Sequence, residues 1–511
     1  MKTLGSGGPD PEVSARPGRW WILAAMALPA FLLNIDFYGI SVALPAIGEA
    51  LGAGTTGLQW AVNGFNLALI APLVAFGRLG DLVGRRRLLL VGVALFALGS
   101  ILCGFATDMG MLITGRCVQG LAVALFSTSP LSIVGDVFPE ERHALAFSIW
   151  AAIGAAGSAV GPLVGGALTD LLGWRWFFFI NLPVAALTIA LVLAIVPESR
   201  DETADGPFDR LGFVTITLGL AALVYGLQSG DDAGWTTLPV LGSLLTGAAL
   251  LTVAVRAERS AEQPLLEPGL LRLPGYGAVL GVAVAGNFGF SAVIFFSALY
   301  LQDQLDLAPL RAGIAMLAFS VCFVVTLPLA GSLMRQVGPR LLMAIGMVLM
   351  TAASLMFLPG GLWWLVLALG VAGIGQGFAF NTSTTAAMGA VPASHSGSAA
   401  GVLNAARQLG SILGIAGAGT VFQTLESSGL LAAAARGHTE VDAQQIALIR
   451  ALYTGSSSAR TTLADLAPSI HSELEDIMAA VFDASFRGAM LACAIVSLAG
   501  VIVALRVRPA R

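Results

Sequence analysis

The chain has 511 residues, of which 57% are hydrophobic and 11% are charged, with a net charge of −4 and a mean hydropathy of +0.85. Soluble proteins carry about 25% charged residues, so these values exclude a large soluble domain and predict an all-α polytopic membrane protein. The four cysteines and four histidines lack metal-ligand spacing, and the sequence has no nucleotide-binding loop. We therefore expect no enzyme activity, metal, cofactor or nucleic-acid partner.

Apolar stretches of about 18–25 residues predict fourteen membrane spans. They cover residues 20–46, 58–77, 88–107, 109–132, 144–168, 175–196, 211–228, 238–255, 277–300, 311–334, 340–357, 362–388, 398–422 and 487–506. With the N-terminus in the cytoplasm, eighteen of the 26 basic residues fall inside, six fall outside, and Arg116 and Arg407 fall within spans. This distribution predicts a plasma-membrane protein with both termini in the cytoplasm.

The first span contains an acid. Asp36 lies in the apolar run from Trp21 to Leu51, whose other charged residue is Glu49. A carboxylate at that depth is costly, and burial favours its neutral form, so Asp36 can gain and lose a proton while a second solute moves. We predict that Asp36 carries protons. The alternative is an acid that only hydrogen-bonds a neighbouring helix.

The fourth span contains an arginine. Arg116 lies about seven residues, or about 10 Å, from the outer end of its span, and Asp36 lies about 15 Å from the outer end of its own. The depths overlap, so an Asp36–Arg116 ion pair is feasible if the two spans adjoin. Arginine would hold the acid ionised until substrate or a proton breaks the pair. A purely structural buried pair is the alternative.

Several positions recur along the chain at a nearly constant offset. The pairs are Gly77 with Gly331 (331 − 77 = 254), Pro139 with Pro392, Gly157 with Gly410 and Gly161 with Gly414 (each 253). Parallel repeats are a common plan of secondary transporters, and these pairs predict two six-helix bundles separated by two inserted helices. The predicted units are a tail at 1–19, bundles at 20–199 and 273–506, an insert at 200–272 and a tail at 507–511.

The last outer loop, residues 423–486, is polar, rich in alanine and acidic. The stretches Asp442–Tyr453 and Leu474–Phe486 predict amphipathic helices, separated by a break at Gly455–Ser458. We expect a small helical hairpin at the outer surface. It is either a site for an accessory partner or gating, or a mere connector.

The loop between spans 2 and 3 contains Gly77, Asp81, Gly84, Arg85 and Arg86. With these residues it resembles the signature loop of the major facilitator superfamily, and nearly the whole chain resembles its fourteen-span drug:proton antiporter branch. The glycines permit a tight turn, and Asp81 can cap a helix N-terminus. The resemblance implies a cytoplasmic latch between the halves that breaks during alternating access. Charges that only set the topology are the alternative.

Span 5 carries a glycine motif. Gly157, Gly161 and Gly165 share one helix face, and Pro162 and Gly166 accompany them. Small residues let helices approach closely, and proline bends a helix. The segment resembles the antiporter motif of drug exporters, although that family usually has a further glycine where this chain has Ser148. Ordinary membrane packing is the alternative.

Span 1, from Ile35 to Pro45, resembles the motif of the same branch. That motif normally has Thr at Tyr38 and Asn at Ser41, which leaves the substrate range open. Arg116 matches an arginine of span 4 that the family associates with proton transfer. The resemblance therefore implies proton coupling through Asp36 and Arg116.

Polar and aromatic residues within the spans predict an apolar cavity with sparse polar anchors, which suits loosely selected amphiphiles. These residues are Asn34, Tyr38, Asn63, Asn66, Gln119, Asn287, Phe288, Asn381, Asn404 and Arg407. Together with the family resemblance, they predict a monomeric antiporter that expels amphiphilic drugs or antibiotics and is driven by the proton gradient. The alternatives are an exporter of a single metabolite, such as an endogenous antibiotic or siderophore, proton-coupled uptake, and a membrane sensor.

Overall fold

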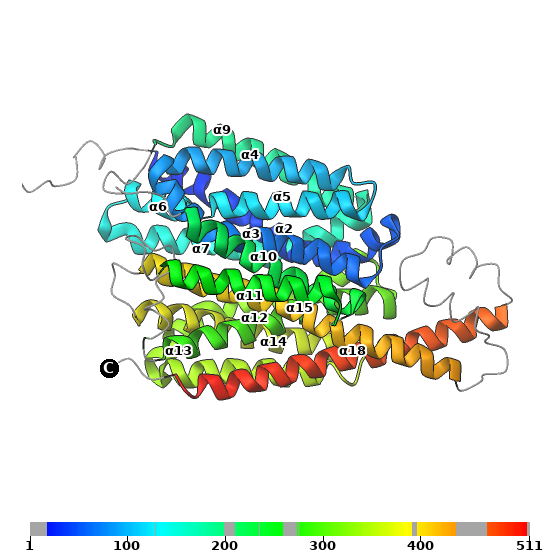
Figure 1. Cartoon of the computed structure of the whole chain (residues 1–511). Coiled ribbons are helices and arrows are strands. Elements are labelled where there is room, and N and C mark those ends of the chain that lie inside the picture. The colour runs from blue at the N-terminus through cyan, green and yellow to red at the C-terminus, as the bar shows by residue number, and fades with distance from the viewer. Residues whose placement is uncertain are drawn as a thin grey trace, which may run out of the picture.

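The computed structural model describes residues 18–127, 129–198, 210–234, 236–258, 273, 275–390, 396–435 and 468–507, and these residues form helices joined by short turns (Figure 1). The helices are α2 (Arg19–Leu51), α3 (Thr55–Val83), α4 (Arg85–Gly104), α5 (Met109–Phe126), α6 (Ser129–Val137), α7 (Glu140–Leu172), α8 (Arg175–Phe179), α9 (Asn181–Ile195), α10 (Arg210–Ala233), α11 (Leu238–Glu258), α12 (Tyr276–Leu299), the π-helix η2 (Tyr300–Gln304), α13 (Pro309–Met356), α14 (Leu362–Gly389), α15 (Ser396–Ala435) and α18 (Pro468–Ala504). Among these residues there is no strand. The expected all-α fold is confirmed.

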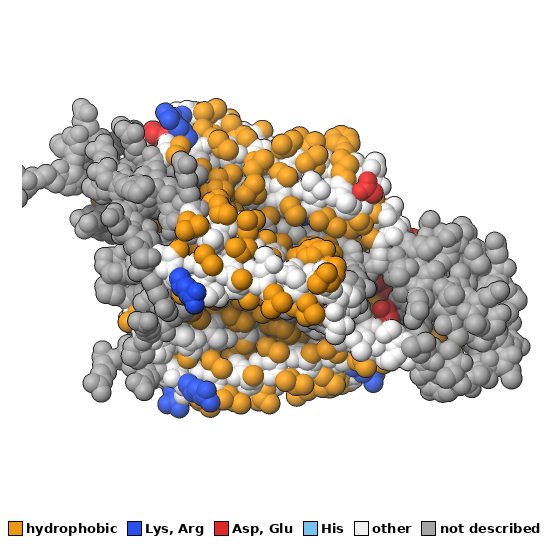
Figure 2. All heavy atoms as spheres, in the orientation of Figure 1, with side chains coloured by type: hydrophobic (Ala, Val, Ile, Leu, Met, Phe, Trp, Pro, Cys, Tyr) orange, Lys and Arg blue, Asp and Glu red, His pale blue; other side chains and the backbone are white. Residues whose placement is uncertain are grey.

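Eleven helical segments of the described chain are long and apolar enough to cross a membrane. Three further predicted spans coincide with α3, α10 and α15, which are not among those eleven. Hydrophobic side chains cover the middle of the visible face, and its charged side chains lie toward the two ends of the helices (Figure 2). Leu238, Leu171 and Ile495 are 85%, 72% and 69% exposed, as lipid-facing residues are.

The internal repeat of the sequence is also a repeat of packing. A Cβ on Gly157 of α7 would lie 2.5 Å from the carbonyl oxygen of Phe31 on α2, and Gly410 of α15 lies against the carbonyl oxygen of Val284 on α12 in the same way. The two contacted residues are also 253 positions apart (284 − 31 = 253). Each half therefore holds its first and fifth helices together through glycines whose missing side chains let the backbones touch.

The repeated loop has a glycine with positive φ in both halves. Gly84, before α4, has φ of 119°, and Gly338, at the kink within α13, has φ of 79°. Both φ values lie in the left-handed region that favours glycine. This backbone conformation explains why the repeat has a glycine at this position in each half.

The inserted helices α10 and α11 pack against each other, and α10 contacts both halves. Trp60 of α3 lies 6.0 Å from Tyr225 of α10 between ring centroids, while Val224 packs with Ile412 of α15. The insert thus contributes to the interface between the two six-helix halves, which we call the seam.

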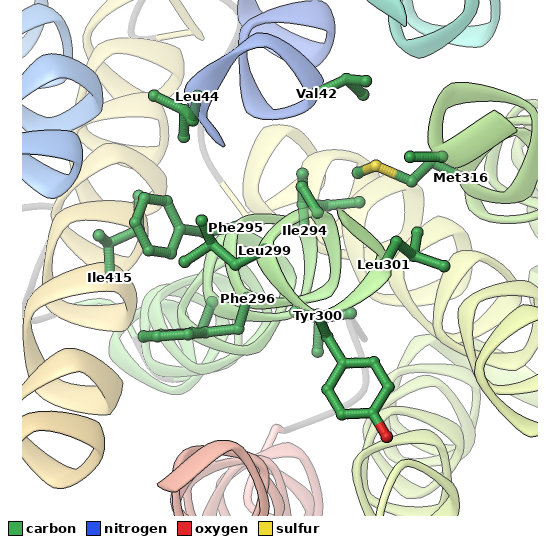
Figure 3. Close-up of a cluster of buried hydrophobic side chains, with 14 of the residues drawn as sticks. Val42, Leu44, Ile294, Phe295, Phe296, Leu299, Tyr300, Leu301, Met316 and Ile415 are labelled. Carbon is green, nitrogen blue, oxygen red and sulfur yellow. The ribbon is translucent and has the colours of Figure 1, made fainter. Parts of the chain in front are cut away.

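A large apolar core also crosses this seam (Figure 3). Val42 and Leu44 of α2 belong to the same buried group as Ile294 and Phe295 of α12 and Ile415 of α15. The first helices of the two halves therefore meet through tightly packed aliphatic and aromatic side chains rather than through charges.

The described ends of the outer loop are both helical. Residues 474–486 are helical as predicted, but they belong to α18, which begins at Pro468 and continues through the last predicted span. On the other side, α15 extends to Ala435. Both helices continue from an apolar span into polar residues of the loop. The end of the apolar stretch in the sequence is therefore not the end of the helix. Asp442–Tyr453 and Gly455–Ser458 lie outside the described residues.

Candidate proton and substrate site

Asp36 lies in a buried polar cluster, which we define as Asp36, Ser100, Arg116, Gln119 and Asn181. These side chains come from α2, α4, α5 and α9, and none is more than 1% exposed. The structure thus brings together Asp36 and Arg116, the two residues that the sequence singled out for proton coupling. Gln119, which was expected in the substrate cavity, belongs to this cluster instead.

The Asp36–Arg116 ion pair is short and uses one carboxylate oxygen of Asp36, Oδ2. Arg116 Nη1 donates to Asp36 Oδ2 at 2.5 Å and to Gln119 Oε1 at 2.8 Å, and its Nε donates to the carbonyl oxygen of Ala61 at 3.1 Å. The guanidinium also lies over the ring of Phe65, 4.4 Å from its centroid. Arg116 therefore keeps several partners that do not depend on the charge of Asp36.

The second carboxylate oxygen has weaker contacts. Gln119 Nε2 and Asn181 Nδ2 lie 3.5 Å and 3.4 Å from Asp36 Oδ1. Both amides also donate to Ser100 Oγ, at 2.9 Å and 3.1 Å, and this hydroxyl donates to the carbonyl oxygen of Phe96. Ser100 thus holds both amides beside Asp36 Oδ1. Because the contacts of this oxygen are long, it can still accept a proton.

Ser100 and Asn181 were not identified from the sequence. Asn181 follows the aromatic run Trp176–Phe179 at the start of α9, and Ser100 lies among apolar residues of α4. Their polarity in apolar segments was the available signal. Hydropathy alone does not show which way a helix faces.

The span 5 motif packs in two directions. Gly161 and Gly165 lie against α2, at Tyr38 and Gly39, while Gly166 lies against the carbonyl oxygen of Pro309 at the start of α13. In return, Gly313 lies against the carbonyl oxygen of Pro162. The motif therefore joins the two halves by backbone contact at the predicted outer end.

Two hydrogen bonds reinforce this closure. Gln302 Nε2 donates to the carbonyl oxygen of Val42 at 2.9 Å, and Gln423 Nε2 donates to Thr56 Oγ1 at 2.8 Å. Each joins a helix of one half to a helix of the other. The halves are thus in contact at the predicted outer end.

The signature loop binds within its own half. Arg85 Nη1 forms an ion pair with Asp136 at 2.8 Å, and Arg86 donates its backbone N–H to Glu198 at 3.2 Å and its Nη2 to the carbonyl oxygen of Leu193 at 2.9 Å. The capping role expected of Asp81 stays a prediction. Helix α3 continues through Val83, so Asp81 lies in its last turn, and Gly84 is the N-cap of α4. The Asp81 side chain and the environment of Gly77 lie outside the described part of the chain.

Several predicted substrate residues serve the helices themselves. The side-chain amides of Asn34 and Asn287 donate to Ala30 O and Ala283 O, at 2.7 Å and 2.9 Å, within their own helices. These two asparagines are structural equivalents (287 − 34 = 253). Asn381 donates to the carbonyl oxygen of Leu327 on α13.

Other predicted residues keep free polar groups or form aromatic surfaces. Asn63 and Asn66 of α3 are fully buried, and in the described structure no side-chain atom of either amide has a hydrogen-bond partner. Tyr38 lies 5.6 Å from Phe290 between ring centroids, and Phe288 packs beside Gly414. Asn404 is exposed. In the described residues, no group of His, Cys, Asp and Glu is arranged to hold a metal ion.

The fold and this charged pair in a helical bundle define a membrane transporter. The model of the Major Facilitator Superfamily matches residues 26–415, and the chain belongs to that superfamily. A solved bacterial homologue of the human lysosomal transporter Spinster, inward-facing and unoccupied, has the same fold, with a TM-score of 0.64 and 18% identity over 96% of this chain and 98% of the other.

Curated relatives are more similar in sequence. The multidrug resistance protein Stp of Mycobacterium tuberculosis is 33% identical over 464 residues, which is 89% of this chain and 85% of Stp. The probable actinorhodin transporter of Streptomyces coelicolor is 34% identical over 459 residues, 85% of this chain and 79% of the relative. The expected superfamily and the assignment as a transporter rather than an enzyme are confirmed.

Proposed function

We propose that this protein exports amphiphilic drugs or antibiotics across the plasma membrane in exchange for protons. The buried Asp36–Arg116 pair is the observation that carries the proposal, because a costly ionised acid within a membrane bundle marks a proton or ion pathway. The names of Stp, a multidrug resistance protein, and of other efflux pumps among the relatives support the direction of transport. In this proposal the chain is a monomer with fourteen spans and both termini in the cytoplasm.

The contacts of the cluster suit the following order of events. A proton that reaches Asp36 Oδ1 neutralises the carboxylate and weakens its bond to Arg116, which still has Ala61 O, Gln119 and Phe65 as partners. Arg116 can then shift without being stranded in an apolar environment. Loss of the proton on the other side of the membrane restores the pair. The proton gradient is the energy source, and no cofactor takes part.

The seam between the halves supplies groups for an amphiphile. Asn63 and Asn66 occur on the same face of α3 as Gln59, which touches Gly419 of α15, and their amides are unpaired in the described structure. Aromatic rings of α2 and α12 lie near the same seam. Buried amides without partners gain a hydrogen bond when a polar substrate group reaches them.

The test uses proteoliposomes with an imposed pH gradient and a panel of lipophilic dyes and antibiotics. We expect substrate to release protons through the wild-type protein and not through Asp36→Asn. Asp108→Asn is the matched control, because Asp108 is an exposed N-cap and asparagine caps equally well. Normal substrate-driven proton movement in Asp36→Asn would refute the assignment of Asp36.

A dedicated exporter of one metabolite is the second candidate. Tyr38 and Ser41, which depart from the family motif, follow Asp36 by two and five residues on α2. Two relatives are named for actinorhodin and for tetracenomycin C export. Transport of a single compound in a chemically broad panel would favour this candidate.

A further inference from the structure

Arg407 is a second buried arginine, and the proton cycle does not use it. It lies on α15 and is 6% exposed. Its Nη2 donates to the carbonyl oxygen of Phe380 at 2.8 Å, to Ser383 Oγ at 3.1 Å and to Thr384 Oγ1 at 2.6 Å. All three acceptors belong to α14 and are neutral.

No acid of the described residues balances the charge of Arg407. In the described structure no carboxylate forms an ion pair with it, whereas Arg116 has Asp36 at 2.5 Å. Its Nε is buried without a hydrogen-bond partner, and its bonds to the described residues all come from Nη2. Burying a guanidinium without a counter-charge costs free energy. Arginine has five N–H donors, and bonds from one nitrogen leave most of these donors without an acceptor among the described residues.

Helix packing alone does not account for an arginine at this position. The structurally equivalent residue of the first half is Gly154 (407 − 154 = 253), so the repeated helix needs no side chain there. A tie between α14 and α15 needs only a neutral amide, such as the one by which Asn381 joins α14 to α13. Arg407 therefore brings a charge that the fold does not require.

A continuous row of aromatic rings leads to Arg407 from the seam between the halves. Phe290 and Phe319 lie 5.3 Å apart, Phe319 and Phe323 stack at 6.1 Å, and Phe323 meets Phe380 at 5.8 Å. The Arg407 guanidinium lies over the Phe380 ring, 3.7 Å from its centroid. At its other end the row continues through Phe290 to Phe37 of α2, at 6.3 Å.

We propose that Arg407 binds the anionic group of a planar aromatic substrate, a carboxylate or an acidic phenol, while the aromatic row holds its rings. Guanidinium pairs with such oxygens through charge-assisted hydrogen bonds, and flat rings stack on phenylalanine faces. This inference rests on the proposed export function and narrows its substrates to aromatic acids. It also gives the buried charge its missing partner when substrate is bound.

The test compares rhodamine B with its ethyl ester, which share one ring system and differ in a free or blocked carboxylate. Uptake of both dyes is followed in inside-out vesicles holding wild-type protein, Arg407→Gln or Arg407→Lys. We expect Arg407→Gln to lower the transport of rhodamine B relative to the ester by about tenfold or more. Arg407→Lys, which retains the charge, should recover part of that preference.

The ratio between the dyes separates binding from folding, because poor folding lowers both rates together. If both dyes are transported and Arg407→Gln leaves their ratio unchanged, Arg407 is only a tie between helices and the inference is wrong. If the wild-type protein transports neither these dyes nor any compound of the broader panel, the proposed export function fails, and this inference fails with it.

Discussion

The Asp36–Arg116 pair should be strongly coupled in stability. Arg116→Gln leaves the Asp36 carboxylate buried with amide contacts of 3.4 Å and 3.5 Å, and Asp36→Asn leaves a buried guanidinium without its acid. Removing one member of a buried pair costs about 3–5 kcal/mol, because the other charge stays behind in an apolar environment. The double variant replaces both charges by amides and leaves no charge to strand. We therefore expect the double variant to be at least about 2 kcal/mol more stable than the sum of the single effects predicts.

The free energy of unfolding can be measured for all four proteins by titrating mixed micelles with a denaturing detergent. The exposed pair of Asp483 and Arg487, 2.7 Å apart with side chains 29% and 47% exposed, provides the control cycle. Exposed pairs of this kind are worth roughly 0.3–0.5 kcal/mol. A coupling energy for Asp36 and Arg116 as small as that of the control would show that the buried pair is hydrated, and would refute the reasoning.

Two further outcomes follow from packing and burial. Gly157→Ala should lower stability by about 1–3 kcal/mol and slow transport, because its Cβ would lie 2.5 Å from Phe31 O, whereas Gly154→Ala meets nothing closer than 3.7 Å and should be tolerated; equal thermal shifts for the two variants would contradict this. Burial raises the pKa of Glu426, beyond the predicted end of its span, from its usual 4.5 to about 7. The folded state thus holds the proton more tightly than the unfolded state, and the stabilisation present below about pH 4.5 is lost as the pH rises through 7. Melting between pH 5 and 8 should show this fall in the wild-type protein, and a Glu426→Gln variant with the same slope would disprove it.

The sequence was informative where the signal is local. Apolar runs located the helices, and the spacing of Gly157 and Gly161 predicted a close helix contact that the structure places against α2. The Asp36–Arg116 contact could be anticipated because depth in a membrane follows from residue count. Each of these inferences requires only the sequence of one helix, or the depths of two residues in the membrane.

Features that depend on how helices face each other could not be predicted. Ser100 and Asn181 join the polar cluster because α4 and α9 turn those faces toward α2, and hydropathy does not encode that rotation. The sequence likewise did not show that helix α3 continues past Asp81, as far as Val83. The aromatic row to Arg407 likewise depends on how four helices, α2, α12, α13 and α14, turn their faces toward each other.

The shared register of the two halves pairs the buried charged residues Asp36 and Arg407 with uncharged positions in the other half. Asp36 corresponds to Gly289 (289 − 36 = 253), just as Arg407 corresponds to Gly154. The duplicated scaffold thus gained an acid in one half and a lone base in the other, at positions that are not equivalent. With the roles proposed for Asp36 and Arg407, a substitution in the second half can change the substrate preference while the proton coupling of the first half stays intact.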